Sequence, residues 1–194
     1  MLEDFDLKKD RPFIKFSNNT ISQLIVDCFK IDRLDLEIAT LLYEELKLRK
    51  TSKSKILLSE IELEFKKVNH TPIKWLKEAR EKIKEIKNVH NKSKNLNSIY
   101  VVLRNGYSIQ NQTYGAYVGQ TSKTPEQRFI EHKKGIKSAR GLKKYGIQLL
   151  RSLWPYGKVD SDKKLCYETK LHLILKKVVP KVSGDFNKDH LDKC

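Results

Sequence analysis

The spacing of apolar residues changes near residue 96, and this change constrains the fold more than any other feature of the chain. Up to residue 95 the apolar side chains recur at intervals of three and four, which is typical of amphipathic helices. A polar, unpatterned stretch at 88–97 follows, and after it come runs of Val, Ile, Leu and Tyr typical of strands. The sequence therefore predicts an α+β protein, with an all-helical region at 1–95 and a mixed domain at 96–194.

The spacing predicts four helices in the first region, at 20–29, 34–49, 54–67 and 72–87. We expect the last helix to begin at Thr71-Pro72, with Thr as the cap and Pro at the first helical position. Its basic face and its short distance from the preceding helix are typical of a helix-turn-helix that reads the major groove. An ordinary bundle with a solvated lysine face explains the same pattern.

The second region predicts the element order ββααβα. Strands are expected at Ser98–Arg104, Tyr114–Gln120 and Ile147–Trp154, and helices at about 125–134, 138–144 and 163–178. The first two strands are interpreted as an antiparallel pair joined by a polar loop through Ser108–Thr113. Thr124, Pro125 and Gln127 supply a capping residue, a Pro at the first helical position and the partner of a capping box.

The chain is strongly and unevenly basic. It has 40 Lys and Arg against 24 Asp and Glu, a net charge of +16. Residues 1–100 hold 21 basic and 16 acidic residues, and residues 101–194 hold 19 and 8. Such a field concentrates polyanions, of which nucleic acid is the commonest. A lysine-rich proteome is the alternative explanation, but the asymmetry favours a nucleic-acid partner.

The cysteines and the amino terminus predict a soluble, cytoplasmic protein without a membrane partner. Cys28, Cys166 and Cys194 are odd in number and widely spaced, so we expect neither a disulfide framework nor a metal-binding pair. The acidic start Met1–Asp6 does not resemble a signal peptide. No segment approaches the roughly 20 apolar residues that cross a bilayer.

One ordered set of side chains in the second region can act on a phosphodiester: Tyr100, Tyr117, Arg128, His132 and Glu168. The two tyrosines fall on neighbouring predicted strands, and Arg128 and His132 share one helix face. Tyrosine can orient a water and accept its proton when a positive charge is near. Arginine offers a planar fork to phosphate, and a single Glu can hold Mg²⁺, which keeps most of its waters. Each residue alone is more often packing or surface, so the prediction depends on their joint spacing.

At these residues the chain resembles the GIY-YIG nuclease family. Ile99-Tyr100 matches the end of the first motif, and Tyr117-Val118-Gly119 matches the second. The Arg128-x3-His132 pair, the turn Leu142–Gly146 and Glu168 follow in family order. The resemblance covers about residues 98–178. It implies a small nuclease domain with a central three-stranded antiparallel sheet, flanked by helices, that hydrolyses DNA with one metal ion.

The resemblance also implies a role for each residue of the set. Tyr117 activates the water and Tyr100 supports it, while Arg128 holds the scissile phosphate. His132 assists proton transfer or binds the phosphate, and Glu168 binds Mg²⁺ or Mn²⁺.

Three positions depart from the family pattern. Ser98 replaces the first Gly, which is a mild change because a small residue suffices there. Gln120 stands where a basic residue is common, with Lys123 as its candidate substitute. No Asn follows shortly after Glu168, and the nearest, Asn187, lies far along the chain.

The sequence therefore predicts a metal-dependent endonuclease that acts on double-stranded DNA, of a type II restriction-like or defence type. A homing, phage or repair endonuclease, a catalytically inactive nucleic-acid-binding protein and a helical interaction protein with an appended scaffold domain are the alternatives. The amino-terminal helices would contact DNA or form a homodimer, since cutting a duplex requires two strand cleavages. The residues expected to bind DNA are Lys123, Lys133, Lys134, Lys137, Arg140, Lys143, Lys144, Lys74, Lys77 and Arg80.

Overall fold

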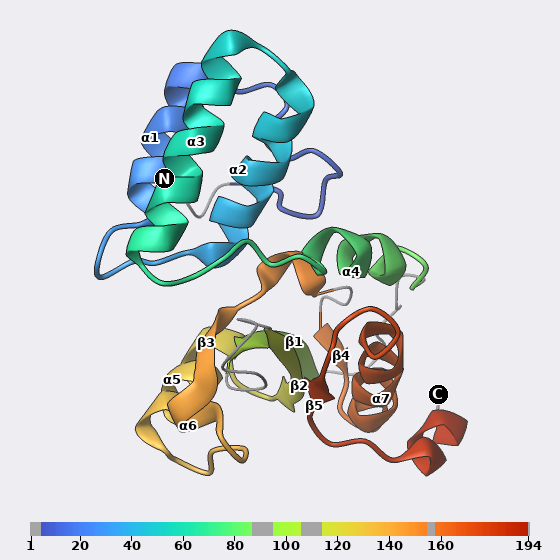
Figure 1. Ribbon diagram of the computed structural model, residues 1–194. Helices are drawn as coiled ribbons and strands as arrows, with labels where there is room; N and C mark the ends of the chain where they lie inside the picture. Colours follow the sequence, from blue (N-terminus) through green and yellow to red (C-terminus); the bar gives the residue numbers. More distant parts are fainter. Residues whose placement is uncertain (1–4, 87–94, 106–113, 155–157, 194) are drawn as a thin grey trace. The chain divides into compact units, whose positions relative to one another are not determined.

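The computed structural model describes residues 5–86, 95–105, 114–154 and 158–193, with elements labelled as in Figure 1. The chain divides into two compact units, Met1–Leu76 and Lys77–Cys194. The described residues contain seven α-helices and a mixed sheet of five strands, so the protein is α+β with helices at its amino terminus. The expected boundary, in the polar stretch at 88–97, lies largely outside the described residues.

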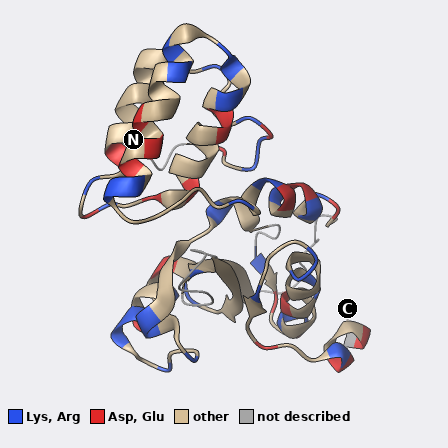
Figure 2. Cartoon of the chain, in the orientation of Figure 1, with Lys and Arg blue, Asp and Glu red and all other residues tan. Residues whose placement is uncertain are grey.

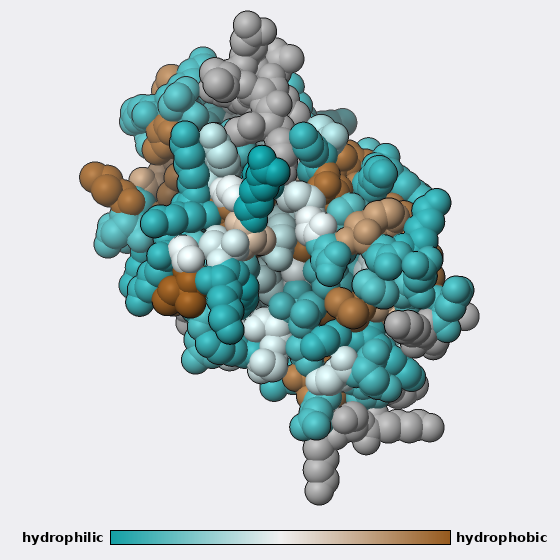
Figure 3. All heavy atoms as spheres, turned by 90° about the horizontal axis from the view of Figure 1, so that it is seen from below, coloured by the Kyte–Doolittle hydropathy of each residue, from teal (hydrophilic) through white to brown (hydrophobic). Residues whose placement is uncertain are grey.

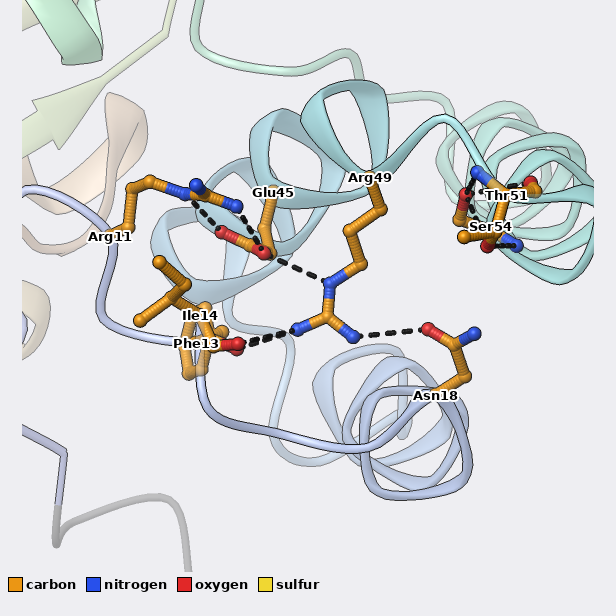
Figure 4. A network of polar contacts seen from close by, with 8 residues as sticks. All are labelled: Arg11, Phe13, Ile14, Asn18, Glu45, Arg49, Thr51 and Ser54. Atoms are coloured by element: carbon orange, nitrogen blue, oxygen red, sulfur yellow. Dashed lines mark hydrogen bonds and ion pairs between the residues drawn. The ribbon is translucent and has the colours of Figure 1, made fainter.

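Three helices form the first unit: α1 (Asn18–Cys28), α2 (Leu36–Arg49) and α3 (Ser52–Lys67). Each is capped by a polar side chain that accepts a backbone N–H of the first turn, the capping residues being Ser17, Asp35 and Thr51. These helices confirm the first three expected helices. A buried carboxylate, Glu45, binds Arg11 and Arg49 and so ties the amino-terminal segment to α2 (Figure 4).

The fourth expected helix begins later than the sequence indicated. Helix α4 spans Leu76–Ile83, so Thr71-Pro72 does not open it. Ile73 is buried, and its N–H donates to Thr40 Oγ1 over 3.0 Å, which holds the preceding segment out of the helix. The expected helix-turn-helix is thus divided between the two units. Arg80, expected on the outer face of this helix, is instead only 6% exposed.

The sheet of the second unit is built around one central strand. β1 (Leu96–Arg104) pairs antiparallel with β2 (Gly115–Thr121), β3 (Gly146–Leu149) and β4 (Lys158–Asp160). β5 (Val182–Ser183) joins the other edge of β2 in the parallel direction. The three expected strands are therefore present and antiparallel. β4 and β5 were not predicted, because runs of two or three residues carry no readable alternation.

Helices cover this sheet and carry part of the candidate site. They are α5 (Pro125–Lys134), α6 (Leu142–Tyr145) and α7 (Lys164–Leu175), with short 3₁₀ helices η1 (Arg151–Leu153) and η2 (Lys188–Lys193). Thr124 and Gln127 form the predicted capping box of α5. The expected third strand is shorter than predicted, because η1 replaces its second half. Hydrophilic side chains cover most of the face shown in Figure 3, and hydrophobic ones form small separate patches.

The state of the cysteines and the length of the helices bear on two further expectations. Cys28 is free and buried, but Cys166 is disulfide-bonded, with its partner outside the described residues. The spacing of the cysteines along the chain did not reveal this bond, because folding decides which sulfur atoms meet. In the described part of the chain no helix is long and apolar enough to cross a membrane.

Candidate active site

The β1–β2 pairing brings the two tyrosines onto one face of the sheet. Tyr100 is opposite Gly119, and Tyr117 lies two residues before that glycine on the same strand. The two rings have centroids 6.2 Å apart. A Cβ atom at Gly119 would lie 2.6 Å from Tyr117 Cε1 and 2.8 Å from Tyr100 Oη. The glycine of the second motif is therefore a site residue, because its missing side chain is the space that the rings share.

His132 reaches the buried tyrosine from α5. Its Nε2 lies 2.9 Å from Tyr100 Oη, and its Nδ1 accepts the Ala139 N–H over 3.2 Å. Burial, together with the charge of Arg128, lowers the pKa of His132 to about 4, so the ring is neutral near pH 7. Because Nδ1 accepts a hydrogen bond, the single ring proton is on Nε2. His132 therefore donates to Tyr100 Oη.

The Tyr117 ring lies beside Tyr100 and His132, with its centroid 6.2 Å from the Tyr100 ring and 5.8 Å from the His132 ring. Burial raises the pKa of both phenols. A hydrogen bond between the two tyrosines raises the pKa of Tyr100 and lowers that of Tyr117. Tyr100 is fully buried, whereas Tyr117 is partly exposed, so Tyr117 is the phenol that meets solvent.

Arg128 is the cation of this cluster, and most of its hydrogen bonds are already made. Its Nη1 donates to Glu131 over 3.0 Å and to the Ile136 carbonyl over 3.3 Å, and its Nη2 donates to the Lys137 carbonyl over 2.7 Å. No acceptor among the described residues takes the Nε–H or the second Nη2 hydrogen. Its charge lowers the pKa of both Tyr100 and Tyr117. Two of its five donors are thus left for a ligand.

Glu168 projects from α7 and is 3% exposed. Burial raises its pKa to about 8, and the charge of Asp185 contributes in the same direction. Hydrogen bonding from the Asp185 backbone and the charge of Lys164 lower this pKa and so oppose the rise. Glu168 in turn raises the pKa of Tyr117, so the carboxylate lies close to the phenols. Asp185 was not predicted, and no motif in the sequence marked it.

The five predicted catalytic residues therefore lie in one cluster, but the residues at its edges have other partners. Gln120 accepts a hydrogen bond from Asn97 Nδ2 over 2.9 Å. Lys123 forms an ion pair with Glu131, the same carboxylate that binds Arg128. Asn187 uses its side-chain oxygen to accept the Asp189 N–H within its own turn.

Exposed cations gather at the carboxyl end of α5 and on α6 (Figure 2). The basic patch, as we name it, consists of Lys133, Lys134, Lys137, Arg140, Lys143 and Lys144. Lys74 and Lys77 are also exposed. The unit Lys77–Cys194 holds 26 Lys and Arg against 11 Asp and Glu, whereas Met1–Leu76 holds 14 against 13. Nearly all of the net positive charge of the chain thus belongs to the unit that contains Tyr100 and Tyr117.

The donor atoms at Glu168 suit a hard divalent cation. Carboxylate oxygens are the ligands that Mg²⁺ and Mn²⁺ prefer, and Mg²⁺ needs only one or two of them from the protein. Within the described ranges no group of three or more His, Cys, Asp or Glu side chains could hold a metal ion. A site here would be completed by water and substrate oxygens.

No protein-family model, curated protein or solved structure matches this chain.

Proposed function

We propose that the unit Lys77–Cys194 is a metal-dependent endonuclease of the GIY-YIG type that hydrolyses phosphodiester bonds in double-stranded DNA. The observation that carries this proposal is the cluster of His132, Tyr100 and Tyr117. His132 Nε2 lies 2.9 Å from the Tyr100 hydroxyl, and the partly exposed Tyr117 ring lies beside both of the other rings. Hydrogen bonding to a phenol oxygen stabilises negative charge on that oxygen, as a general base requires.

Tyr117 is the residue that meets the attacking water. In its phenolate form it accepts the water proton, while the hydrogen bond from Tyr100 stabilises that form. Tyr100 is 0% exposed and cannot reach the water itself, so its role is to position and polarise Tyr117. His132, held by the Ala139 N–H, keeps the Tyr100 hydroxyl turned toward Tyr117.

Arg128 and Glu168 act on the phosphate side of the reaction. The two remaining donors of Arg128 can bind one non-bridging oxygen of the scissile phosphate. Glu168 would hold Mg²⁺ or Mn²⁺, whose charge stabilises the leaving oxygen and offsets the carboxylate charge that raises the pKa of Tyr117. The basic patch supplies contacts to the DNA backbone.

A nucleic-acid-binding protein without hydrolytic activity is the second candidate. It is favoured by Arg128, which already makes three hydrogen bonds within α5 and the following loop. It is also favoured by the raised pKa of Tyr117, which keeps the phenol neutral without a bound cation. Among active enzymes we favour the restriction-like or defence type, acting as a homodimer or by sequential nicking.

Nicking of a supercoiled plasmid in Mg²⁺ or Mn²⁺ separates the two candidates. We expect the wild type to convert the plasmid to open and linear forms, and Glu168→Gln to lose at least a thousandfold in rate. Glu126→Gln, on the exposed first turn of α5, is the matched control and should cut normally. DNA binding without cutting by the wild type in either metal would support the second candidate. Sequencing the product ends then distinguishes a fixed site from scattered cleavage.

A further inference from the structure

Glu131, in the second half of α5, is an acidic side chain that holds two cations at once. Its Oε2 accepts a hydrogen bond from Arg128 Nη1 over 3.0 Å, and its Oε1 forms an ion pair with Lys123. Each oxygen of the carboxylate thus has a different cation as its partner. Arg128 is the residue assigned to the scissile phosphate, so this carboxylate is bonded directly to the phosphate-binding group.

Glu131 links the helix that carries Arg128 to the strand that carries Tyr117. It follows Arg128 by three residues, so the two side chains lie on one face of α5. Lys123 precedes this helix, and its backbone N–H donates to Thr121 Oγ1 over 3.1 Å at the end of β2. The carboxylate therefore joins side chains that come from the two elements of the proposed site.

The guanidinium of Arg128 is held in one orientation by three contacts. Besides the carboxylate, it donates to the backbone carbonyls of Ile136 and Lys137 in the loop after α5. The Arg128 side chain is only 19% exposed, so its ion pair with Glu131 is screened less than a pair on the open surface. The carboxylate is the charged member of this set of three acceptors. It therefore contributes most to keeping the two unused hydrogens, on Nε and Nη2, in a fixed direction.

The charge of Glu131 opposes binding of a phosphate. Lys123 and Arg128 carry two positive charges and Glu131 carries one negative charge, which leaves the three side chains with a net charge of +1. Hydrogen bonds from the two cations lower the pKa of Glu131, so the carboxylate is charged near pH 7. Any benefit to a reaction on DNA must therefore come from orientation and not from attraction.

We propose that Glu131 is a positioning residue, which fixes the guanidinium of Arg128 for the scissile phosphate although its charge weakens DNA binding. The inference rests on the proposed function, because it assigns a role in the cleavage reaction. Lys123 then acts through Glu131 and does not touch the phosphate. It therefore does not replace the basic residue that Gln120 lacks.

Rates of plasmid cleavage in Mn²⁺ and duplex binding measured without metal by fluorescence anisotropy test the inference together. Glu131→Gln keeps the size of the side chain and removes its charge. We expect cleavage to slow about tenfold, because Arg128 loses its fixed orientation. DNA binding should tighten about threefold, because a negative charge beside the phosphate is gone. A residue that only supports the fold would lower both the rate and the affinity.

Two further variants complete the test. Glu126→Gln removes a charge from the exposed first turn of the same helix and should change the cleavage rate by less than twofold. Lys123→Gln should slow the wild type about threefold and should not slow Glu131→Gln further, because both changes act on the same contact. Urea denaturation verifies that each variant is folded.

The outcomes separate this inference from the proposed function. An unchanged rate in Glu131→Gln would overturn the positioning role, and so would parallel losses of rate and affinity. Faster cleavage would also overturn it, because the carboxylate would then block Arg128. In these three cases the nuclease proposal still stands, since the wild type cuts DNA and Glu168→Gln does not. No cleavage by the wild type in either metal would refute the nuclease and the role of Glu131 together.

Discussion

Glu45 in the first unit and Glu168 in the second are both almost completely buried, and their carboxylates have opposite surroundings. Glu45 in the first unit binds Arg11 and Arg49, each over 2.9 Å (Figure 4). Burial alone would raise the pKa of Glu45, but the two arginines outweigh it and the pKa is lowered. Glu168 in the second unit forms no ion pair in the part of the chain that the structure describes. Burial and the charge of Asp185 raise its pKa to about 8, although Lys164 acts in the opposite direction. A buried carboxylate paired with arginines is typical of structure, and one with a strongly raised pKa is typical of a functional site.

The two units also differ in their net charge and in the apolar side chains that they expose. The first has a net charge of +1 and the second +15. The first unit also exposes more large aliphatic side chains, namely Ile14, Val26, Ile31, Leu48, Ile56 and Leu63. The phosphate backbone attracts the strongly basic unit, so the catalytic residues and the main DNA contacts belong together in our proposal. The helical unit is less suited to DNA reading than its sequence pattern suggested.

The largest expected effects come from replacing Glu45 and Glu168, one at a time, with glutamine. Glu45→Gln should lower the free energy of unfolding by about 3 kcal/mol, because two arginines lose their anion, and leave cleavage by the folded protein unchanged. Glu168→Gln should abolish cleavage without weakening the fold. The pKa of Glu168 is raised, so wild-type stability falls as pH rises toward about 8, and the variant should lack that fall. Urea denaturation at pH 6 and 8 measures the free energy of unfolding, and plasmid nicking measures cleavage. Equal losses of stability in the two variants would contradict the contrast between Glu45 and Glu168.

Gly119→Ala should reduce cleavage by roughly a hundredfold and stability by about 2 kcal/mol, because the new methyl group overlaps both tyrosines. Gly135→Ala is the control. It is strained by φ +84°, at a cost of about 1 kcal/mol, but its new methyl group would meet only the flexible Lys143 side chain. Full activity in Gly119→Ala would show that close approach of the rings is unnecessary.

The pH dependence of folding tests the neutral state of His132. Its pKa is about 4 in the folded protein, against about 6.5 in an unfolded chain, so the unfolded state binds the proton more readily. The stabilisation of the fold that comes from neutral His132 is complete above pH 6.5. It is lost as pH falls toward 4, and the loss is roughly 2 kcal/mol at pH 4.5. His132→Gln should show a correspondingly shallower loss between pH 7 and 4.5 in urea denaturation. Parallel curves for the variant and the wild type would contradict the assignment.

The smallest effect concerns the basic patch. Lys143→Gln should weaken DNA binding a fewfold and reduce the slope of log affinity against log salt by about one. Lys55→Gln, an exposed lysine on α3 of the first unit, should leave the slope unchanged. Fluorescence anisotropy with a duplex at several salt concentrations measures both. A larger change of this slope in Lys55→Gln than in Lys143→Gln would indicate that the first unit makes the main DNA contacts.

Local sequence signals predicted the elements that carry the site. The capping box at Thr124 located the start of α5, and the four-residue spacing put Arg128 and His132 on it. Alternation located β1 and β2 and therefore the two tyrosines. The same signals misplaced the start of α4, because the hydrogen bond from Ile73 to Thr40 on α2 overrides the Pro-based start. They also placed Arg80 outward, because spacing along a helix does not reveal which faces become covered.

The sequence by itself determined the α+β class, the change from helices to strands and the types of residue that can act on a phosphodiester. These depend on interactions between residues close in the chain, which spacing and capping record directly. Only the tertiary structure decided that Gly119 separates the two rings, that Ala139 sets the proton of His132 and that Glu168 is buried. Those features depend on strand register and burial, because residues that are distant in the chain meet only when it folds.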